Sequence, residues 1–216
     1  MAPAELTLWL LTTIVEGLVV FLCIRQKVVS KFFFFSCYFA ASIVVSVGRF
    51  WVLSRDGSSS VEYLHFYYYS EAVSAILLTL AIWQIGARLA AGRVSREKML
   101  IGGSGILLLV IFFSFSSASY SNSRLITHFT FVISQNTFFI AGFATLVLWV
   151  WNLFNNAEDR IATQFLNVLA VYFALIFLVY WLEQARPFYR GHNDDLFSMA
   201  GAWLPLGCSF ALVKDQ

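Results

Sequence analysis

Four polar side chains stand near the middle of long apolar stretches, where a charge or an amide needs a partner. Glu16 and Glu71 are carboxylic acids, and Gln135 and Asn136 are adjacent amides. A rise of about 1.5 Å per residue along each stretch gives all four a similar depth. Such groups are costly inside a membrane span unless they face other helices, and they often mark ligand sites or proton relays. We therefore expect these residues to line the interior of a helical bundle.

A second set of polar residues is expected nearer the outer surface of the membrane. Among them, Arg49 is close enough in depth to reach Glu71, because the two estimates differ by about 7 Å. Each charge alone would be costly in lipid, so we predict an ion pair. Glu16 has no basic residue at its level, and we expect it to be protonated at neutral pH. The two sets form one candidate site for a ligand or a proton: Glu16, Arg49, His65, Tyr68, Glu71, His128, Gln135, Asn136 and Glu183.

The same groups also suit a purely structural role, as hydrogen bonds that hold the helices of a membrane bundle together. His65 and His128 could together ligate haem or a metal ion. Neither histidine has a sequence-local partner of the kind that metal sites show, so no metal site is predicted. The cofactor stays open, and a bound lipid, a pigment or haem are the alternatives.

The run Gly102-Gly103-Ser104-Gly105 is similar to the GxSG motif of rhomboid intramembrane proteases. A rhomboid also needs a histidine on its sixth helix to take the proton of the serine, and residues 161–183 contain none. A serine without a base within reach is not activated as a nucleophile. We therefore expect these small residues to permit close helix packing, and we predict that the protein is not an enzyme.

The elements that must position these residues are long apolar stretches, each of about twenty residues, enough to cross the roughly 30 Å hydrocarbon core as a helix. The chain is 60% hydrophobic and 12% charged, with a mean hydropathy of +0.76. Apolar runs without alternation favour helices over a barrel. We predict an integral, multi-pass protein of the plasma or inner membrane. The expected fold is all-α, a single domain over residues 1–216 with seven transmembrane helices at about 5–24, 31–53, 62–87, 99–119, 125–151, 161–183 and 196–213.

Basic residues are divided unequally between the two predicted sides of the membrane. Short loops rich in lysine and arginine stay in the cytoplasm, so the N-terminus is expected outside and the C-terminus inside. Membrane lipids are the expected partners, the loop Arg88–Lys98 could also receive a protein partner, and no nucleic acid is expected. Nine of the 14 lysines and arginines fall on the predicted cytoplasmic side: Arg25, Lys27, Lys31, Arg88, Arg93, Arg96, Lys98, Arg160 and Lys214.

Three functions are compatible with this pattern. The favoured one is a binding or sensing module that takes a small apolar or amphipathic ligand into a cavity open to the outer side. The first alternative is an accessory or structural subunit of a larger membrane complex. The second is a small proton-coupled transporter in which Glu16 and Glu71 carry the protons.

Overall fold

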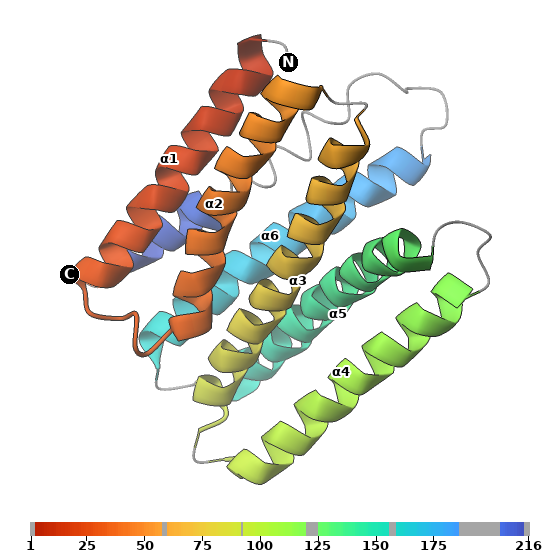
Figure 1. The fold of residues 1–216 in the computed structure, drawn as a ribbon. Coiled ribbons are helices and arrows are strands. Elements are labelled where there is room, and N and C mark those ends of the chain that lie inside the picture. The colour runs from red at the N-terminus through yellow and green to blue at the C-terminus, as the bar shows by residue number, and fades with distance from the viewer. Residues whose placement is uncertain are drawn as a thin grey trace. The chain divides into compact units, whose positions relative to one another are not determined.

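The computed structural model describes residues 3–57, 60–91, 93–119, 125–155, 159–185 and 204–213. These residues form helices joined by short turns, and the predicted all-α class is confirmed for them (Figure 1). Each predicted apolar stretch coincides with a helix, although the last one is described only from residue 204 onward. The helices are α1 (Pro3–Arg25), α2 (Phe33–Asp56), α3 (Val61–Leu89), α4 (Arg96–Ser119), α5 (Leu125–Asn155), α6 (Arg160–Ala185) and a final short helix, Leu204–Val213.

Several of these helices have the length and composition of membrane spans. Large apolar side chains such as Phe112 and Phe143 are exposed at 66% and 68%, which suits contact with lipid and not with water. Two shorter apolar helices, Ile101–Ser116 and Leu204–Val213, accompany them. The molecule is therefore a membrane-type helical protein. Within the described residues, four segments are long and apolar enough to cross a membrane: Phe33–Asp56, Val61–Leu89, Phe129–Asn155 and Arg160–Leu178.

The chain divides into two compact units, each with its own packing. Unit 1 consists of Met1–Lys31 and Thr145–Gln216, and unit 2 of Phe32–Ala144, so the boundary falls within α5. Unit 2 contains the α2–α3 hairpin, α4 and the first part of α5. Unit 1 contains α1, the last part of α5, α6 and the final helix.

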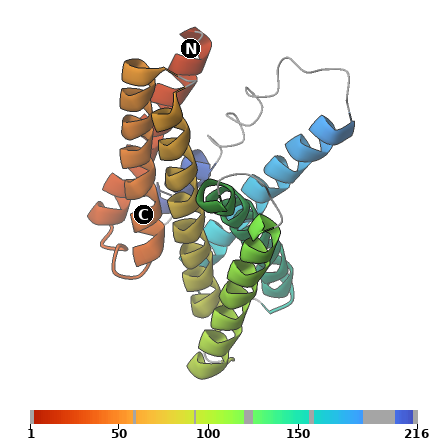
Figure 2. The same cartoon turned by 45° about the vertical axis from the view of Figure 1, so that its right-hand side comes forward.

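In unit 2, α2 and α3 run side by side in both views of the ribbon (Figures 1 and 2). Gly57 ends α2 with a positive φ of 81°, a conformation that glycine adopts without strain. Ser60 then caps α3, because its hydroxyl accepts a hydrogen bond from the backbone N–H of Tyr63 at 3.1 Å. At the other end of the hairpin, the side-chain oxygen of Gln84 accepts from the backbone N–H of Phe34 at 3.0 Å. Both ends of the hairpin thus have partners for helix-terminal N–H groups.

Two glycines of unit 2 allow aromatic rings to lie against helix backbone. A Cβ atom on Gly48 of α2 would stand 2.5 Å from Cζ of Phe66 on α3. A Cβ atom on Gly103 of α4 would stand 2.1 Å from the ring of Trp83 on α3. Both distances are far below van der Waals contact, so a larger residue at either position would require the ring to shift. At Gly103 the ring of Trp83 lies against the helix backbone, whereas nothing in the described part of the chain lies within 4 Å of the Cβ positions of Gly102 and Gly105.

In unit 1, α1 and the final helix lie together and run in the same direction (Figure 1). Gln26, just after α1, donates its side-chain N–H to the carbonyl oxygen of Leu212. Cys23 and Cys208 are both fully buried and close enough to interact electrostatically. The hydrogen bond of Gln26 with Leu212 and the proximity of Cys23 to Cys208 follow the same order along the two segments, as in parallel helices.

In unit 1, the last part of α5 and α6 form a helical hairpin. Asp159 caps α6, since its carboxylate accepts a hydrogen bond from the backbone N–H of Ala162 at 3.1 Å. The indole N–H of Trp149 on α5 donates to the side-chain oxygen of Asn167 on α6 at 3.0 Å. Gly207 of the final helix packs against Val168 of α6, where a Cβ atom would stand 2.6 Å from a valine methyl group.

Candidate functional site

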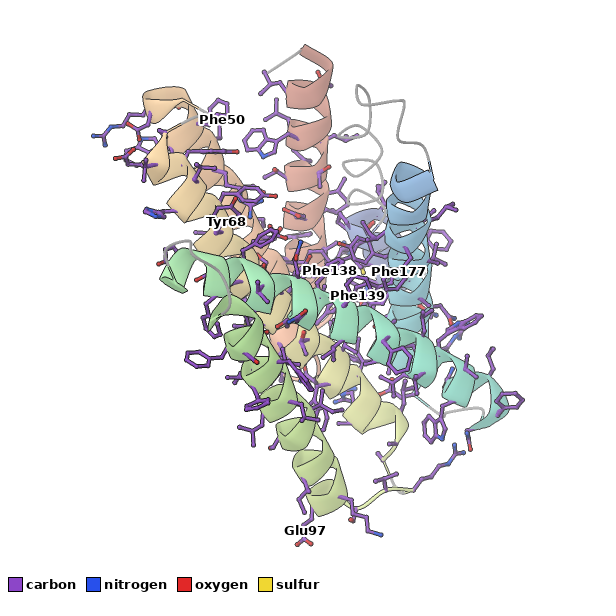
Figure 3. The ribbon with its side chains drawn as sticks, turned by 90° about the vertical axis from the view of Figure 1, so that its right-hand side faces the viewer. Phe50, Tyr68, Glu97, Phe138, Phe139 and Phe177 are labelled. Carbon is purple, nitrogen blue, oxygen red and sulfur yellow. The ribbon has the colours of Figure 1, made fainter. Side chains whose placement is uncertain are left out.

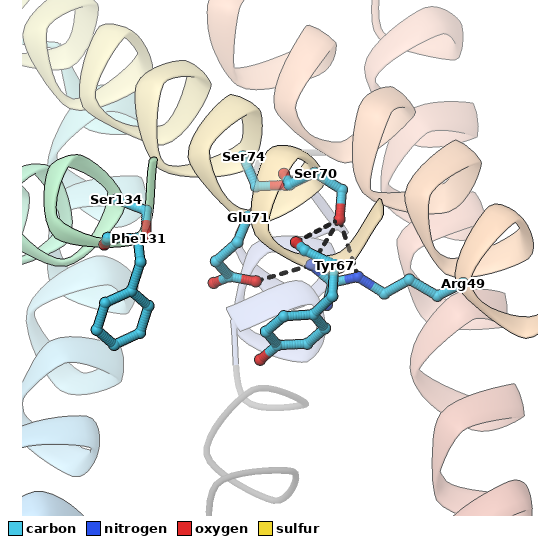
Figure 4. A network of polar contacts seen from close by, with 7 residues as sticks. All are labelled: Arg49, Tyr67, Ser70, Glu71, Ser74, Phe131 and Ser134. Atoms are coloured by element: carbon cyan, nitrogen blue, oxygen red, sulfur yellow. Dashed lines mark hydrogen bonds and ion pairs between the residues drawn. The ribbon is translucent and has the colours of Figure 1, made fainter. Parts of the chain in front are cut away.

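A polar cluster joins the apolar helices α2 and α3 (Figure 4). Nη2 of Arg49 lies 2.8 Å from Oε2 of Glu71, which is both a hydrogen bond and an ion pair. The predicted pairing of these two residues is therefore confirmed. We call Arg49, Tyr67, Ser70 and Glu71 the Arg49 cluster.

Ser70 and Tyr67 hold the guanidinium in place. The hydroxyl oxygen of Ser70 accepts from Nε of Arg49 at 3.1 Å and from Nη2 at 2.9 Å. The same hydroxyl donates to the carbonyl oxygen of Tyr67 at 2.9 Å, which completes its hydrogen-bonding capacity. Cζ of Arg49 lies 4.4 Å from the centroid of the Tyr67 ring, within range of a cation–π interaction. One edge and one face of the guanidinium are thus occupied by α3.

Two atoms of the Arg49 cluster keep free hydrogen-bonding capacity. In the part of the chain that the structure describes, Nη1 of Arg49 and Oε1 of Glu71 have no hydrogen-bond partner. The side chains of Arg49 and Glu71 are 26% and 42% exposed, so the cluster is not sealed within unit 2. The formal charges of the pair cancel. The site therefore offers an open donor on Arg49 and an open acceptor on Glu71, with no net charge.

The spacing of residues along α3 places the members of the cluster on one face. Tyr67, Ser70, Glu71 and Ser74 stand at positions i, i+3, i+4 and i+7, which are neighbours on a helix surface. Ser74 lies one turn further along and donates to the carbonyl oxygen of Ser70 at 2.9 Å. Tyr67 and Ser70 are absent from the residues predicted from the sequence. This spacing around Glu71 is the signal that could have identified them.

Other predicted site residues of unit 2 have separate surroundings. The ring of Tyr68 packs edge-on against Phe131 of α5, with centroids 5.7 Å apart. The ring of His65 lies 6.3 Å from that of Tyr69, one turn along the same helix. Figure 3 shows Tyr68 on the side of α3 that faces α5.

The two adjacent amides of α5 differ in their roles. Asn136 donates a hydrogen bond from Nδ2 to the buried hydroxyl of Ser114 on α4 at 2.9 Å. Gln135 is exposed. Asn136 therefore belongs to an interhelical hydrogen bond, the structural role that the sequence left open.

Glu16 is buried in α1, at 8% exposure, and belongs to unit 1, whereas Glu71 belongs to unit 2. The protonation of Glu16 stays a prediction. The side chains of His128 and Glu183 lie outside the described residues. The possible joint ligation of haem or a metal ion by His65 and His128 therefore also lies outside them. Among the residues that are described, no group of three or more histidine, cysteine, aspartate and glutamate side chains is arranged to hold a metal ion.

No protein-family model matches the chain, and no curated protein or solved structure is significantly similar to it. A fold class alone does not identify a function, which has to be argued from the geometry and chemistry of a site. The Arg49 cluster is the best-defined site in the described residues, because it combines charge, incomplete hydrogen bonding and partial exposure on apolar helices.

Proposed function

We propose that the protein binds a small amphipathic ligand in the membrane and that the Arg49 cluster receives the polar end of this ligand. In this proposal the chain is a seven-span protein of the plasma or inner membrane, with its N-terminus outside and its C-terminus in the cytoplasm. The site opens to the outer side. The observation that carries the proposal is that the Arg49–Glu71 pair keeps an open donor on Arg49 and an open acceptor on Glu71.

The topology is supported by the direction of the first and last helices. α1 and Leu204–Val213 are parallel, as the contacts of Cys23 with Cys208 and of Gln26 with Leu212 indicate. Two parallel spans must have an odd number of other spans between them. If every helix crosses the membrane, the total number of spans is therefore odd. The surplus of basic residues in the loops that follow the odd-numbered spans favours a cytoplasmic C-terminus.

Binding is favoured over a purely structural role by the hydrogen bonds that the Arg49 cluster lacks. Polar groups in hydrocarbon need partners, and an unmet donor or acceptor costs roughly 1–3 kcal/mol. Nη1 of Arg49 and Oε1 of Glu71 are available for such partners, and a ligand with a polar end would supply them.

The test is to identify amphiphiles that remain bound to the protein after purification from its native membrane in mild detergent. Native mass spectrometry of the wild type should show one bound amphiphile of defined mass. The variant Arg49→Gln/Glu71→Gln, which keeps the site neutral but removes its charges, should lose this amphiphile. The matched control is Arg55→Gln/Asp56→Asn, which removes an ion pair of 3.5 Å at the end of α2. Equal retention by all three proteins would refute the proposal.

An accessory subunit of a larger complex is the second candidate, favoured by the exposed aromatic side chains of α4, such as Phe112 and Phe113. These side chains would then contact a partner protein and not lipid. The same purification separates the two functions, because a subunit would carry a stoichiometric protein partner and no amphiphile that depends on Arg49. The proton-coupled transporter stays an alternative, in which Glu71 would have to leave its ion pair with Arg49 before it could carry a proton.

A further inference from the structure

We infer that the Arg49 cluster selects a neutral, hydroxyl-bearing amphiphile, of which a long-chain alcohol is the simplest example. The hydroxyl oxygen would accept a hydrogen bond from Nη1 of Arg49, and the hydroxyl proton would go to Oε1 of Glu71. This inference rests on the proposed function and adds the chemical class of the ligand.

The first argument is the way in which the hydrogens of Arg49 are used. A carboxylate or phosphate binds arginine best through two parallel N–H groups. Ser70 occupies the edge formed by Nε and Nη2, and the second hydrogen of Nη2 goes to Glu71. Only the hydrogens of Nη1 remain, so no edge with two nitrogens is open. The cluster can donate to a single oxygen atom but cannot bind an anion through two parallel N–H groups.

The second argument is charge. Arg49 and Glu71 neutralise each other at a separation of 2.8 Å, so the site attracts neither sign of charge from a distance. An anionic headgroup at Nη1 would stand next to the Glu71 carboxylate, and an ammonium group at Oε1 would stand next to the guanidinium. Like charges repel strongly where the dielectric constant is low. An ionic headgroup would also lose its hydration on entering the apolar region.

The third argument is that a hydroxyl group matches both open atoms. A hydroxyl carries one donor and two acceptor positions, whereas an ether or ester lacks the donor. The apolar part of the ligand would rest on exposed apolar side chains nearby. Leu64 stands seven residues before Glu71 and therefore on the same stripe of α3, and Phe131 of α5 is in contact with Tyr68.

The test uses three photoactivatable probes with the same tail and different headgroups: diazirine- and alkyne-tagged hexadecanol, hexadecanoic acid and hexadecylamine. The full chain is placed in phosphatidylcholine nanodiscs, irradiated with each probe, digested and sequenced by mass spectrometry. We expect the alcohol probe to label the α2–α3 hairpin saturably, with loss of labelling when unlabelled hexadecanol is added in excess. The acid and the amine should give only unsaturable labelling.

Arg49→Lys provides the sharpest variant, because lysine can keep the ion pair with Glu71 but has no guanidinium to present Nη1. We expect about tenfold weaker apparent affinity for the alcohol probe, the effect of losing one hydrogen bond to a charged group. Arg55→Lys is the matched control and should bind as the wild type does. Circular dichroism and gel filtration establish that both variants are folded.

The outcomes separate the two proposals. Saturable labelling of the hairpin by the acid or the amine, and not by the alcohol, would overturn the hydroxyl class while amphiphile binding stands. Saturable labelling by none of the probes would count against amphiphile binding at this site as a whole. Unchanged affinity of a folded Arg49→Lys variant would overturn the role of Nη1.

Discussion

Arg49 of α2 and Glu71 of α3 form an ion pair of 2.8 Å that ties the two helices of the hairpin together. Ser70 and Tyr67 flank the pair on the side of α3, so the guanidinium is held by hydrogen bonds on its edge and by a ring on its face. This arrangement places a charged group on apolar helices without leaving it unpaired. It also makes the stability of the hairpin depend on both partners.

Replacing either charge should therefore destabilise the protein, and replacing both should cost less than the sum. We expect Arg49→Gln or Glu71→Gln to lower the free energy of unfolding in detergent by about 1–3 kcal/mol, because each leaves a charge without its partner. The double variant should show a coupling of at least about 0.5 kcal/mol. Unfolding by sodium dodecyl sulfate measures this cycle. Strict additivity would contradict the coupling, and the exposed Arg55–Asp56 pair serves as a control with little effect.

Gly48→Ala should loosen the α2–α3 hairpin. The new methyl group would meet the end of the Phe66 ring at 2.5 Å, so the ring or the helices must move. We expect a loss of about 1–3 kcal/mol in unfolding free energy, typical of overpacking. Gly17→Ala in α1 is the matched control, since nothing lies within 4 Å of its Cβ position. Combining Gly48→Ala with Phe66→Leu should recover part of the loss, and an equal effect of the two alanine substitutions would refute this account.

Asn136→Ala and Gln135→Ala should differ although the residues are neighbours in the sequence. Asn136 donates to Ser114 across the α4–α5 interface, whereas Gln135 is exposed. We expect a loss of about 0.6–2 kcal/mol for Asn136→Ala, the usual range for a hydrogen bond between membrane helices. Gln135→Ala should be close to neutral in the same unfolding assay. A larger effect at Gln135 would show that the interface is assigned incorrectly.

Cys23 and Cys208 should form a disulfide when membranes are treated with copper phenanthroline. Both thiols are buried where α1 and the final helix meet, and they lie close enough to interact. Mass spectrometry of the digested protein should show the two cysteine peptides linked. Cys37, the third free cysteine, is not part of the expected link. Linkage of Cys37 to either of them, with no link between Cys23 and Cys208, would contradict the packing of unit 1.

The orientation in the membrane can be tested in intact cells with an impermeant thiol reagent. In a chain without its native cysteines, we expect single cysteines at Ser58 and Ser121 to be labelled and one at Ser95 to be protected. The reason is that Ser95 lies in the most basic loop, which the positive-inside rule keeps in the cytoplasm. Labelling at Ser95 alone would invert the topology.

Hydropathy along the chain was sufficient to locate the helices of this protein. Backbone groups in lipid must form hydrogen bonds within their own segment, so a long apolar stretch has few alternatives to a helix. The rise per residue is constant, which gives the depth of each residue along its helix. Depth alone was enough to pair Arg49 with Glu71, because charges at similar depth have few other partners.

What the sequence could not provide is the rotation of each helix about its axis and the identity of its neighbours. Asn136 and Gln135 have nearly the same depth, yet one faces Ser114 and the other is exposed. Ser70 and Tyr67 join the Arg49 cluster because close packing at Gly48 brings α2 against their face of α3. Helices of similar hydropathy can pack in many ways, and side-chain shape at the contacts selects among them. The positions of the helices along the chain were thus determined by the sequence, whereas the faces that meet were decided by tertiary packing.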